Sequence, residues 1–246
     1  MLTTGTVMQG DVPDERYYPP LAFVNWCARI SHRAEDAEKQ DVERFLRSVV
    51  LDHGDWSVME HVCISVDAIV DRGITHEIVR HRIASYTQES TRFVNYAKKM
   101  PPSFIYPVVG VECSRCLENR PLNPPPKFNW EHVNENGGEL VPCEYDHDWL
   151  EAIATVESKY KALLAKGWRP QEARSVFPNA LASRIVITQN LRQWRHFFLM
   201  RTSIEAHPQM RQVTIPLLAD FKAAIPVIYE DIEPNAKQSE NLKKGR

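Results

Sequence analysis

The segment RHRIASYTQESTR, which begins at Arg80, sets several cationic side chains close to a run of small polar residues. Arg80, His81 and Arg82 open the segment, and Ser90 and Arg92 lie near its other end. Like charges this close repel one another unless they point into water or surround an anion. Because several guanidinium groups can each donate charge-assisted hydrogen bonds to one phosphate, the pattern indicates a phosphate or pyrophosphate site. For the triplet alone, an exposed basic helix end is the simpler interpretation.

Arginine outnumbers lysine in the chain, which has 19 Arg and 11 Lys. From Arg169 to Arg211 there are seven Arg and no Lys. A surface that only needs charge would use both residue types, whereas the planar fork of guanidinium matches phosphate and carboxylate oxygens. The excess indicates local recognition of anions or ion pairs buried in interfaces.

The composition excludes several classes of protein. The net charge of −2 over 246 residues gives no overall field that would attract nucleic acid or an anionic membrane. The N-terminal residues lack the basic and apolar regions of a secretory signal, and no apolar stretch is long enough for a membrane span. With five cysteines, an odd number, we expect reduced thiols in a cytoplasmic protein.

Hydrophobic spacing, together with Pro and Gly positions, predicts the elements that must position these residues. Strands are expected over 61–70, 103–111 and 183–190, the second broken by Pro107. Helices are expected over 19–33, 39–54, 73–82, 146–167, 169–178, 191–202 and 208–225. The irregular order of strands and helices favours an α+β fold, a mixed sheet flanked by helices, over a doubly wound fold.

We expect one domain over residues 1–246, with an insertion or long loop at 112–146 and a polar tail at 234–246. The insertion carries cysteines and a histidine that match the ligand number and types of a structural zinc site: Cys113, Cys116, Cys143 and His147. The 26 residues between Cys116 and Cys143 are not a standard zinc spacing. Free thiols are therefore the favoured interpretation, no metal is assigned, and a zinc site that orders the insertion is the alternative.

The full spacing of the basic segment is RHR, seven residues, Ser, one residue and Arg. It resembles the signature of the flavin-dependent thymidylate synthases at every fixed position. Three further collinear segments are similar to that family: HGDWSVMEHVCISV (53–66), EARSVFP (172–178) and TQNLRQWRHFFLMR (188–201). The resemblance covers most of residues 15–105 and 147–225. It implies a mixed α/β fold and a homotetramer whose active sites are shared between subunits.

The resemblance also implies which residues bind the ligands. Those expected to contact FAD are Ser57, Arg80, His81, Arg82, Gln88, Asn190, Arg192 and His196. Those expected to contact dUMP are Glu77, Arg80, Gln88, Glu89, Ser90, Arg92, Arg174 and Arg201, and Arg201 is the catalytic residue that activates the uracil. The implied reaction is reductive methylation of dUMP to dTMP. Methylenetetrahydrofolate supplies the carbon, and NADPH supplies the reducing equivalents through FAD.

One contact position departs from the family, because Glu77 stands where Gln is usual. A carboxylate cannot donate a hydrogen bond and repels phosphate, so Glu77 would meet a sugar hydroxyl or pair with an arginine. Methylation of UMP or another pyrimidine nucleotide is therefore an alternative function. A nucleic-acid-binding module is a further alternative, which the acidic net charge and scarcity of Lys disfavour.

The segment that ends at Arg201 predicts how that guanidinium is supported. Trp194, Phe197 and Phe198 are expected in the core or a subunit interface rather than against the flavin. Arg195 lies off this apolar face and is expected to meet water or another subunit. No cysteine has a recognisable nucleophile context, so no covalent protein nucleophile is expected, and we interpret Ser90 as a hydrogen-bonding ligand of the nucleotide.

Overall fold

The computed structural model describes residues 20–31, 41–98, 101–105, 131–133, 140–142 and 147–243. These residues belong to two compact units. The first unit comprises Met1–Ala68, Ile78–Thr87 and Val186–Arg246, and the second comprises Ile69–Glu77 and Gln88–Ile185.

The first unit is mainly helical. Its elements are α1 (Pro20–Ser31), α2 (Val42–Leu46), the π-helical turn η1 (Arg47–Asp52), the 3₁₀ helix η2 (Trp56–His61), α7 (Leu191–Arg201), α8 (Pro208–Ala224) and α9 (Gln238–Lys243). The second unit contains most of α3 (Arg72–Ile78), together with β3 (Glu131–Val133), β4 (Leu140–Pro142), α5 (His147–Ala165), α6 (Pro170–Ala173) and the 3₁₀ turn η4 (Arg174–Val176). Among the described residues, the structure has no helix with the length and apolar character that a membrane crossing requires.

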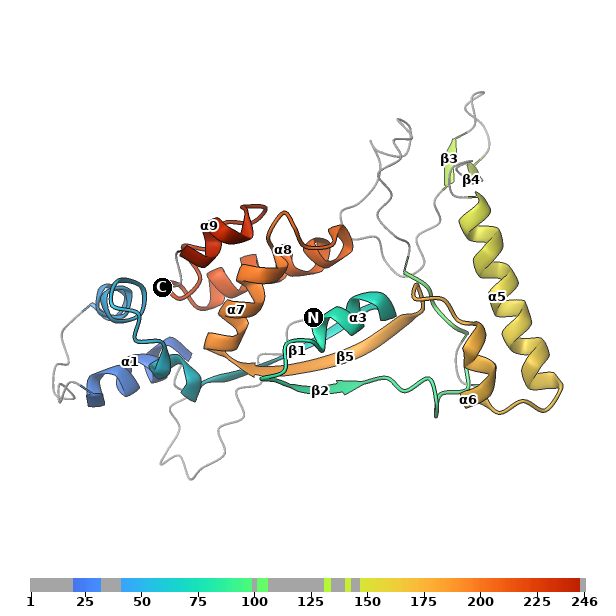
Figure 1. Ribbon diagram of the computed structural model, residues 1–246, viewed down its shortest axis with the longest axis horizontal. Helices are drawn as coiled ribbons and strands as arrows, with labels where there is room; N and C mark the ends of the chain where they lie inside the picture. Colours follow the sequence, from blue (N-terminus) through green and yellow to red (C-terminus); the bar gives the residue numbers. More distant parts are fainter. Residues whose placement is uncertain are drawn as a thin grey trace. The chain divides into compact units, whose positions relative to one another are not determined.

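A three-stranded sheet includes Ser85–Gln88 of the basic segment. Its order is β1 (Cys63–Asp71), β5 (Ala182–Asn190) and β2 (Ser85–Gln88), so β5 is the central strand (Figure 1). The Leu191 amide donates to the Val62 carbonyl at 3.0 Å, and the Arg72 amide donates to the Leu181 carbonyl at 3.1 Å. Because these pairs join opposite ends of the two strands, β1 and β5 run antiparallel. Helices combined with a small sheet confirm the α+β prediction.

The core of the first unit is an aromatic cluster around α7. Trp194 and Phe198 are fully buried, and their rings pack against Phe221 of α8 at centroid distances of 5.1 and 5.0 Å. The Trp194 indole N–H also donates to the Ile64 carbonyl at 3.1 Å, which joins α7 to β1. Such contacts satisfy the one polar atom of a buried indole. The prediction that the aromatic residues of α7 belong to the core is confirmed.

The second unit has its own core, formed where α5 meets α6 and η4. Tyr160 of α5 is 1% exposed and stacks on Phe177 with ring centroids 4.5 Å apart. Tyr96 lies edge-on to Phe177 at 5.5 Å, and Leu181 and Ala173 complete the buried cluster. Tyr96 and Val94 belong to the segment that follows the basic signature, so this segment packs into the core of the second unit through their side chains.

Several local predictions differ from the structure. Ser85–Gln88, part of the run of small polar residues for which no strand is predicted, form β2, because they pair with β5 through their backbone and alternate between exposed and half-buried positions. The expected insertion contains the antiparallel pair β3 and β4, and the expected polar tail contains α9. The expected strand over 103–111 is reduced, among its described residues, to a bridge between Phe104 and Leu181.

Candidate functional site

Arg201 and His81 are joined directly in the first unit, although 120 positions separate them in the sequence. The Arg201 Nε–H donates to His81 Nε2 at 2.9 Å. The His81 ring lies edge-on to Phe197, with centroids 4.9 Å apart, and 5.8 Å from the ring of His196. The structure therefore brings together one residue of the basic triplet, the expected catalytic residue and the expected flavin contact His196.

The environment of His81 keeps its imidazole neutral. Burial, followed by the positive charges of Arg201 and His196, lowers the pKa of His81 to about 4. Burial and the Arg201 charge also lower the pKa of His196. Because Nε2 accepts the hydrogen bond from Arg201, the single proton of the neutral His81 ring is on Nδ1. His81 can thus orient the Arg201 guanidinium without adding a competing positive charge.

We expect His81 to titrate near pH 4 rather than near the ordinary histidine value of 6.5. Between these values the unfolded chain binds more protons at this site than the folded one. The stability contributed by the neutral ring is therefore complete above about pH 6.5 and declines as the pH falls toward 4. NMR of ¹⁵N-labelled histidines measures this titration. In Arg201→Gln, which removes the second cause, the pKa of His81 should rise; an unchanged pKa in that variant would contradict the assigned cause.

Tyr86 fixes the turn that carries the basic triplet. Its hydroxyl lies 2.5 Å from the His81 carbonyl and 3.0 Å from the Ile78 carbonyl, so its proton can be shared between these two acceptors. Burial raises the pKa of Tyr86, which keeps the phenol protonated as a donor. Tyr86 was not identified from the sequence, where the only signal for an inward position is that it is the one aromatic residue of SYTQ (85–88).

Arg80 and Arg82 are exposed on this turn. Within the described ranges neither side chain has a hydrogen-bond or ion-pair partner. Ser57 is exposed on η2 of the same unit. These positions leave the two guanidinium groups and the Ser57 hydroxyl available to an external anion or hydrogen-bonding ligand.

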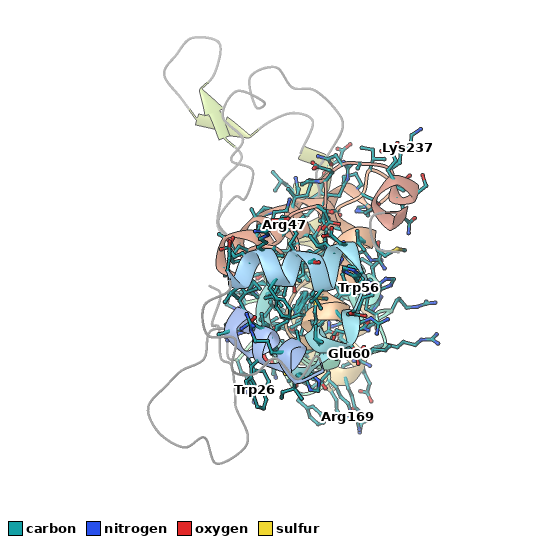
Figure 2. All side chains as sticks on the ribbon, turned by 90° about the vertical axis from the view of Figure 1, so that its left-hand side faces the viewer. Trp26, Arg47, Trp56, Glu60, Arg169 and Lys237 are labelled. Atoms are coloured by element: carbon teal, nitrogen blue, oxygen red, sulfur yellow. The ribbon has the colours of Figure 1, made fainter. Side chains whose placement is uncertain are left out.

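The start of α7 holds two further expected flavin contacts. Asn190 is its N-cap, and the side-chain Oδ1 accepts from the Gln193 amide at 2.9 Å. The amide nitrogen of Asn190 is thereby turned away from the helix end. The Arg192 guanidinium pairs with Glu60 of η2 at 2.5 Å, with both side chains nearly half exposed (Figure 2 labels Glu60). Glu60 was not identified from the sequence, since it lies 132 positions from Arg192.

In the second unit, the arginines expected to bind the nucleotide are held by neutral groups. The Arg174 guanidinium donates to the Thr91 hydroxyl at 3.0 Å, and the Arg92 Nε–H donates to Gln171 Oε1 at 3.3 Å. The Ser90 hydroxyl accepts from the Arg92 amide at 3.3 Å. Because neutral acceptors position a guanidinium without cancelling its charge, Arg92 and Arg174 keep their attraction for an anion. Thr91 and Gln171 were not identified from the sequence.

The three remaining expected nucleotide contacts also lie in the second unit. Gln88 donates its side-chain amide to Thr75 and Ser183, at 3.0 Å each. The Glu89 carboxylate accepts from the Tyr96 hydroxyl at 2.9 Å and, with burial as the larger cause, raises the pKa of that phenol. The carboxylate of Glu89 is therefore directed toward the unit's core. Glu77 lies half-buried near the end of α3.

The expected sites divide between the two units. The residues expected to contact FAD lie in the first unit, except Gln88. The residues expected to contact dUMP lie in the second unit, except Arg80 and Arg201. Among the described residues, no cluster of three or more His, Cys, Asp or Glu side chains could hold a metal. Cys113, Cys116, Cys143 and the side chain of His147 lie outside the described residues, so the zinc alternative stays a prediction.

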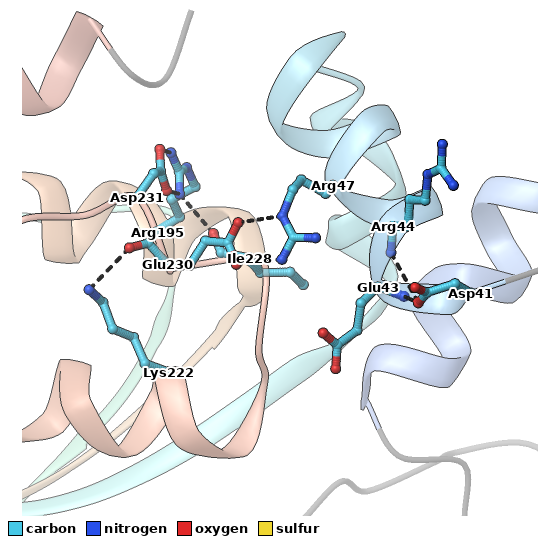
Figure 3. Close-up of polar contacts among 9 residues, drawn as sticks. All are labelled: Asp41, Glu43, Arg44, Arg47, Arg195, Lys222, Ile228, Glu230 and Asp231. Carbon is cyan, nitrogen blue, oxygen red and sulfur yellow. Dashed lines mark hydrogen bonds and ion pairs between the residues drawn. The ribbon is translucent and has the colours of Figure 1, made fainter.

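The prediction for Arg195 was wrong. Its side chain is 3% exposed and forms a bidentate pair with Asp231, with both N–O distances 2.6 Å (Figure 3). It also donates to the Ile228 carbonyl at 2.7 Å, and its guanidinium lies over the Trp56 ring at 4.7 Å. The aromatic periodicity of α7 indicated a polar face, but the partners that cover this face come from distant parts of the chain.

Comparison with known proteins places these observations in a family. The model of the family described as "Thymidylate synthase complementing protein" matches residues 16–227. A protein named flavin-dependent thymidylate synthase from Mycobacterium bovis (strain BCG / Pasteur 1173P2) is 32% identical over 197 residues, which are 77% of this chain and 69% of the relative. A protein of the same name from Saccharolobus solfataricus is 30% identical over 213 residues, 86% of this chain and 69% of the relative. The chain therefore belongs to the thymidylate synthase complementing family, the enzyme family of the flavin-dependent thymidylate synthases.

Proposed function

We propose that this enzyme converts dUMP to dTMP by reductive methylation. Methylenetetrahydrofolate is the proposed carbon donor, FAD the proposed flavin and NADPH the proposed reductant. The observation that carries the proposal is the hydrogen bond between Arg201 and His81, at 2.9 Å. It joins a guanidinium suited to activating a uracil to the basic triplet expected to hold a flavin.

The residues of the first unit fit a flavin dinucleotide. A pyrophosphate carries negative charge, and Arg80 and Arg82 are exposed cations without a partner in the described part of the chain. The amide nitrogen of Asn190 and the Ser57 hydroxyl add donors suited to ring or sugar oxygens. The neutral His81 can present its Nδ1–H. When bound, the reduced flavin supplies the hydride that turns the transferred one-carbon unit into a methyl group.

The chain's own residues would bind and polarise the nucleotide. Arg92 and Arg174 keep their full charge and suit the phosphate of dUMP, with the Ser90 hydroxyl as an additional ligand. Arg201, half-buried and held by His81, would set its fork against the N3–C4–O4 edge of uracil. A fixed cation at that edge stabilises the negative charge that develops in the ring as carbon 5 becomes nucleophilic. No covalent bond to the protein is needed.

The proposed assembly is a homotetramer in which neighbouring subunits complete each active site, as the family resemblance implies. Light scattering coupled to size-exclusion chromatography measures the mass against the 28.4 kDa of one chain. A monomer that is fully active would contradict the shared site.

The proposed function is tested by release of tritium from carbon 5 of labelled nucleotide, with FAD, NADPH and methylenetetrahydrofolate present. We expect release from dUMP and formation of dTMP. Equal or faster release from UMP would favour the alternative substrate, to which Glu77 gives some weight because a carboxylate could accept from an additional ribose hydroxyl. Absence of release from both nucleotides would overturn the proposal.

Arg82→Ala should lose bound flavin while the fold is kept. Arg82 is exposed and has no partner among the described residues, so its removal takes a cation from the proposed pyrophosphate site and nothing from the core. The visible absorption spectrum of the purified protein measures flavin occupancy. Arg44→Ala, which removes an exposed arginine of α2 in the same unit, should keep the wild-type spectrum. Full occupancy in Arg82→Ala would remove the residue from the flavin site.

A further inference from the structure

Gln88 is anchored by two buried hydroxyl groups to which the family resemblance assigns no role. Its side-chain amide nitrogen donates to Thr75 Oγ1 of α3 and to Ser183 Oγ of β5, each at 3.0 Å. Thr75 is 0% exposed and Ser183 is 1% exposed, whereas Gln88 itself is half-buried. The amide of Gln88 therefore has one end fixed inside the second unit.

The hydrogen bonds of Thr75 decide which way the Gln88 amide points. The Thr75 hydroxyl lies 2.9 Å from the Arg72 carbonyl, and a carbonyl can only accept. Thr75 must therefore donate its single proton to Arg72, so toward Gln88 it can only accept. The Gln88 atom that faces Thr75 must then be a donor, which is the amide nitrogen and not the oxygen. This network resolves the amide orientation, which in other surroundings is ambiguous.

The orientation leaves the Gln88 carbonyl oxygen, Oε1, as the group that meets a ligand. Within the described ranges, no residue donates a hydrogen bond to Oε1. Oε1 is also not one of the buried atoms without a partner, so it remains accessible to a ligand. Oε1 can only accept, so it complements a ligand N–H or O–H and opposes a ligand atom that is itself an acceptor. A carbonyl fixed in this way selects more strongly than one that can rotate, because a mismatched ligand cannot recruit the amide nitrogen instead.

We propose that Thr75 and Ser183 are positioning residues that lock Gln88 as a hydrogen-bond acceptor for the pyrimidine nucleotide, which makes Gln88 a determinant of specificity. This inference rests on the proposed function for the nature of the ligand. The donor that Gln88 recognises is either the N3–H of the uracil ring or the 3′-hydroxyl of the sugar. Both are single donors on an otherwise acceptor-rich nucleotide.

Binding of nucleotide analogues to the flavin-loaded enzyme tests the proposal by calorimetry. N3-methyl-dUMP lacks the ring donor, and 2′,3′-dideoxyUMP lacks the sugar donor. We expect one of them to bind the wild-type enzyme about 3- to 10-fold more weakly than dUMP, the size of one hydrogen bond. Thr75→Val keeps the shape of the side chain but lacks the hydroxyl. In this variant the binding of dUMP should weaken, and the difference in affinity between dUMP and that analogue (the gap) should disappear. Thr75→Ser, which keeps the hydroxyl, should restore the gap.

A merely structural role for Thr75 would leave a different signature. Thr75→Val would then lower the melting temperature and weaken the binding of dUMP and of the analogue by the same factor, so the difference in affinity would remain. If Thr75→Val does not fold, Ser183→Ala provides the same test, because it removes the second acceptor of the Gln88 amide nitrogen. A gap that survives in the folded variant overturns the inference, as does equal wild-type binding of dUMP and both analogues. A wild-type enzyme that does not bind dUMP overturns the proposed function as well.

Discussion

Arg201→Lys should lower the turnover number by about 100- to 1,000-fold while flavin remains bound, which is the cost of losing one donor to a developing oxyanion. Lysine keeps the positive charge but cannot reproduce two functions of this guanidinium at once. The Arg201 Nε–H donates to His81 at 2.9 Å, and only a guanidinium combines such a donor with the planar fork that is proposed to contact the substrate. A lysine ammonium that reached the substrate would lose the hydrogen bond to His81. An ammonium that kept this hydrogen bond would present no pair of donors to the substrate.

Steady-state kinetics with varied dUMP separates activation from simple anchoring. If Arg201 acted only on the phosphate, lysine would serve as a point charge, and the loss would appear mainly as a raised KM. Near-normal turnover with a raised KM would mean that Arg201 binds the nucleotide but does not activate the uracil. Arg211→Lys is a suitable control, because the Arg211 side chain donates to groups with no proposed role in the site, the Ala206 carbonyl at 3.2 Å and Asn235 Oδ1 at 2.8 Å. It should retain wild-type turnover.

The support of Arg201 also explains why it can keep its orientation. It ends α7, whose buried face carries Trp194, Phe197 and Phe198. The Thr214 hydroxyl of α8 donates to the Arg201 carbonyl at 2.7 Å, which ties the last turn of α7 to the next helix. The hydrogen bond to His81 holds the guanidinium, and the hydrogen bond from Thr214 holds the backbone of the same residue. Little reorganisation is then needed when charge develops beside the guanidinium.

The sequence was sufficient for features encoded by local patterns and by the family signature. The bounds expected for the helix over 191–202 and the strand over 183–190 differ from α7 and β5 by one residue at an end. The family expected from RHR-x7-S-x-R is confirmed by the comparisons. Both predictions succeed for a physical reason. The period of apolar residues along a helix or strand and the spacing of arginines are properties of short segments, so they can be recognised without knowledge of distant contacts.

The features that were missed are those that depend on distant partners. β2 has four residues, SYTQ, without an apolar run, and becomes a strand only because β5 provides backbone hydrogen bonds. Arg195 looked like a surface residue because its partner Asp231 lies 36 positions away. The neutral anchors Thr91 and Gln171 are ordinary residues in the sequence, and only the hydrogen bonds to Arg174 and Arg92 give them a role.

Asp231→Ala should lower the free energy of unfolding by roughly 3–5 kcal/mol, the cost of leaving one partner of a buried ion pair alone. The Arg195 guanidinium is 3% exposed, so its charge cannot be solvated when the carboxylate is removed. The pair also holds an unusual stretch of backbone. Val227, a β-branched residue, has φ of 78°, and the next residue, Ile228, accepts the Arg195 hydrogen bond at 2.7 Å. A conformation of this kind persists only when surrounding contacts impose it.

The adjacent carboxylate provides a matched control for Asp231→Ala (Figure 3). Glu230 forms a bidentate pair with Arg47 at 2.7 and 2.8 Å, but both side chains are at least 40% exposed. The Arg47 guanidinium lowers the pKa of Glu230, yet water screens the pair and can solvate either charge alone. Glu230→Ala should therefore leave the urea midpoint nearly unchanged, whereas Asp231→Ala should shift it strongly. Equal shifts would mean that Arg195 does not depend on its buried partner. Because Arg195 lies on α7 between Arg192 and Arg201, a folded Asp231→Ala protein should also bind flavin more weakly than Glu230→Ala.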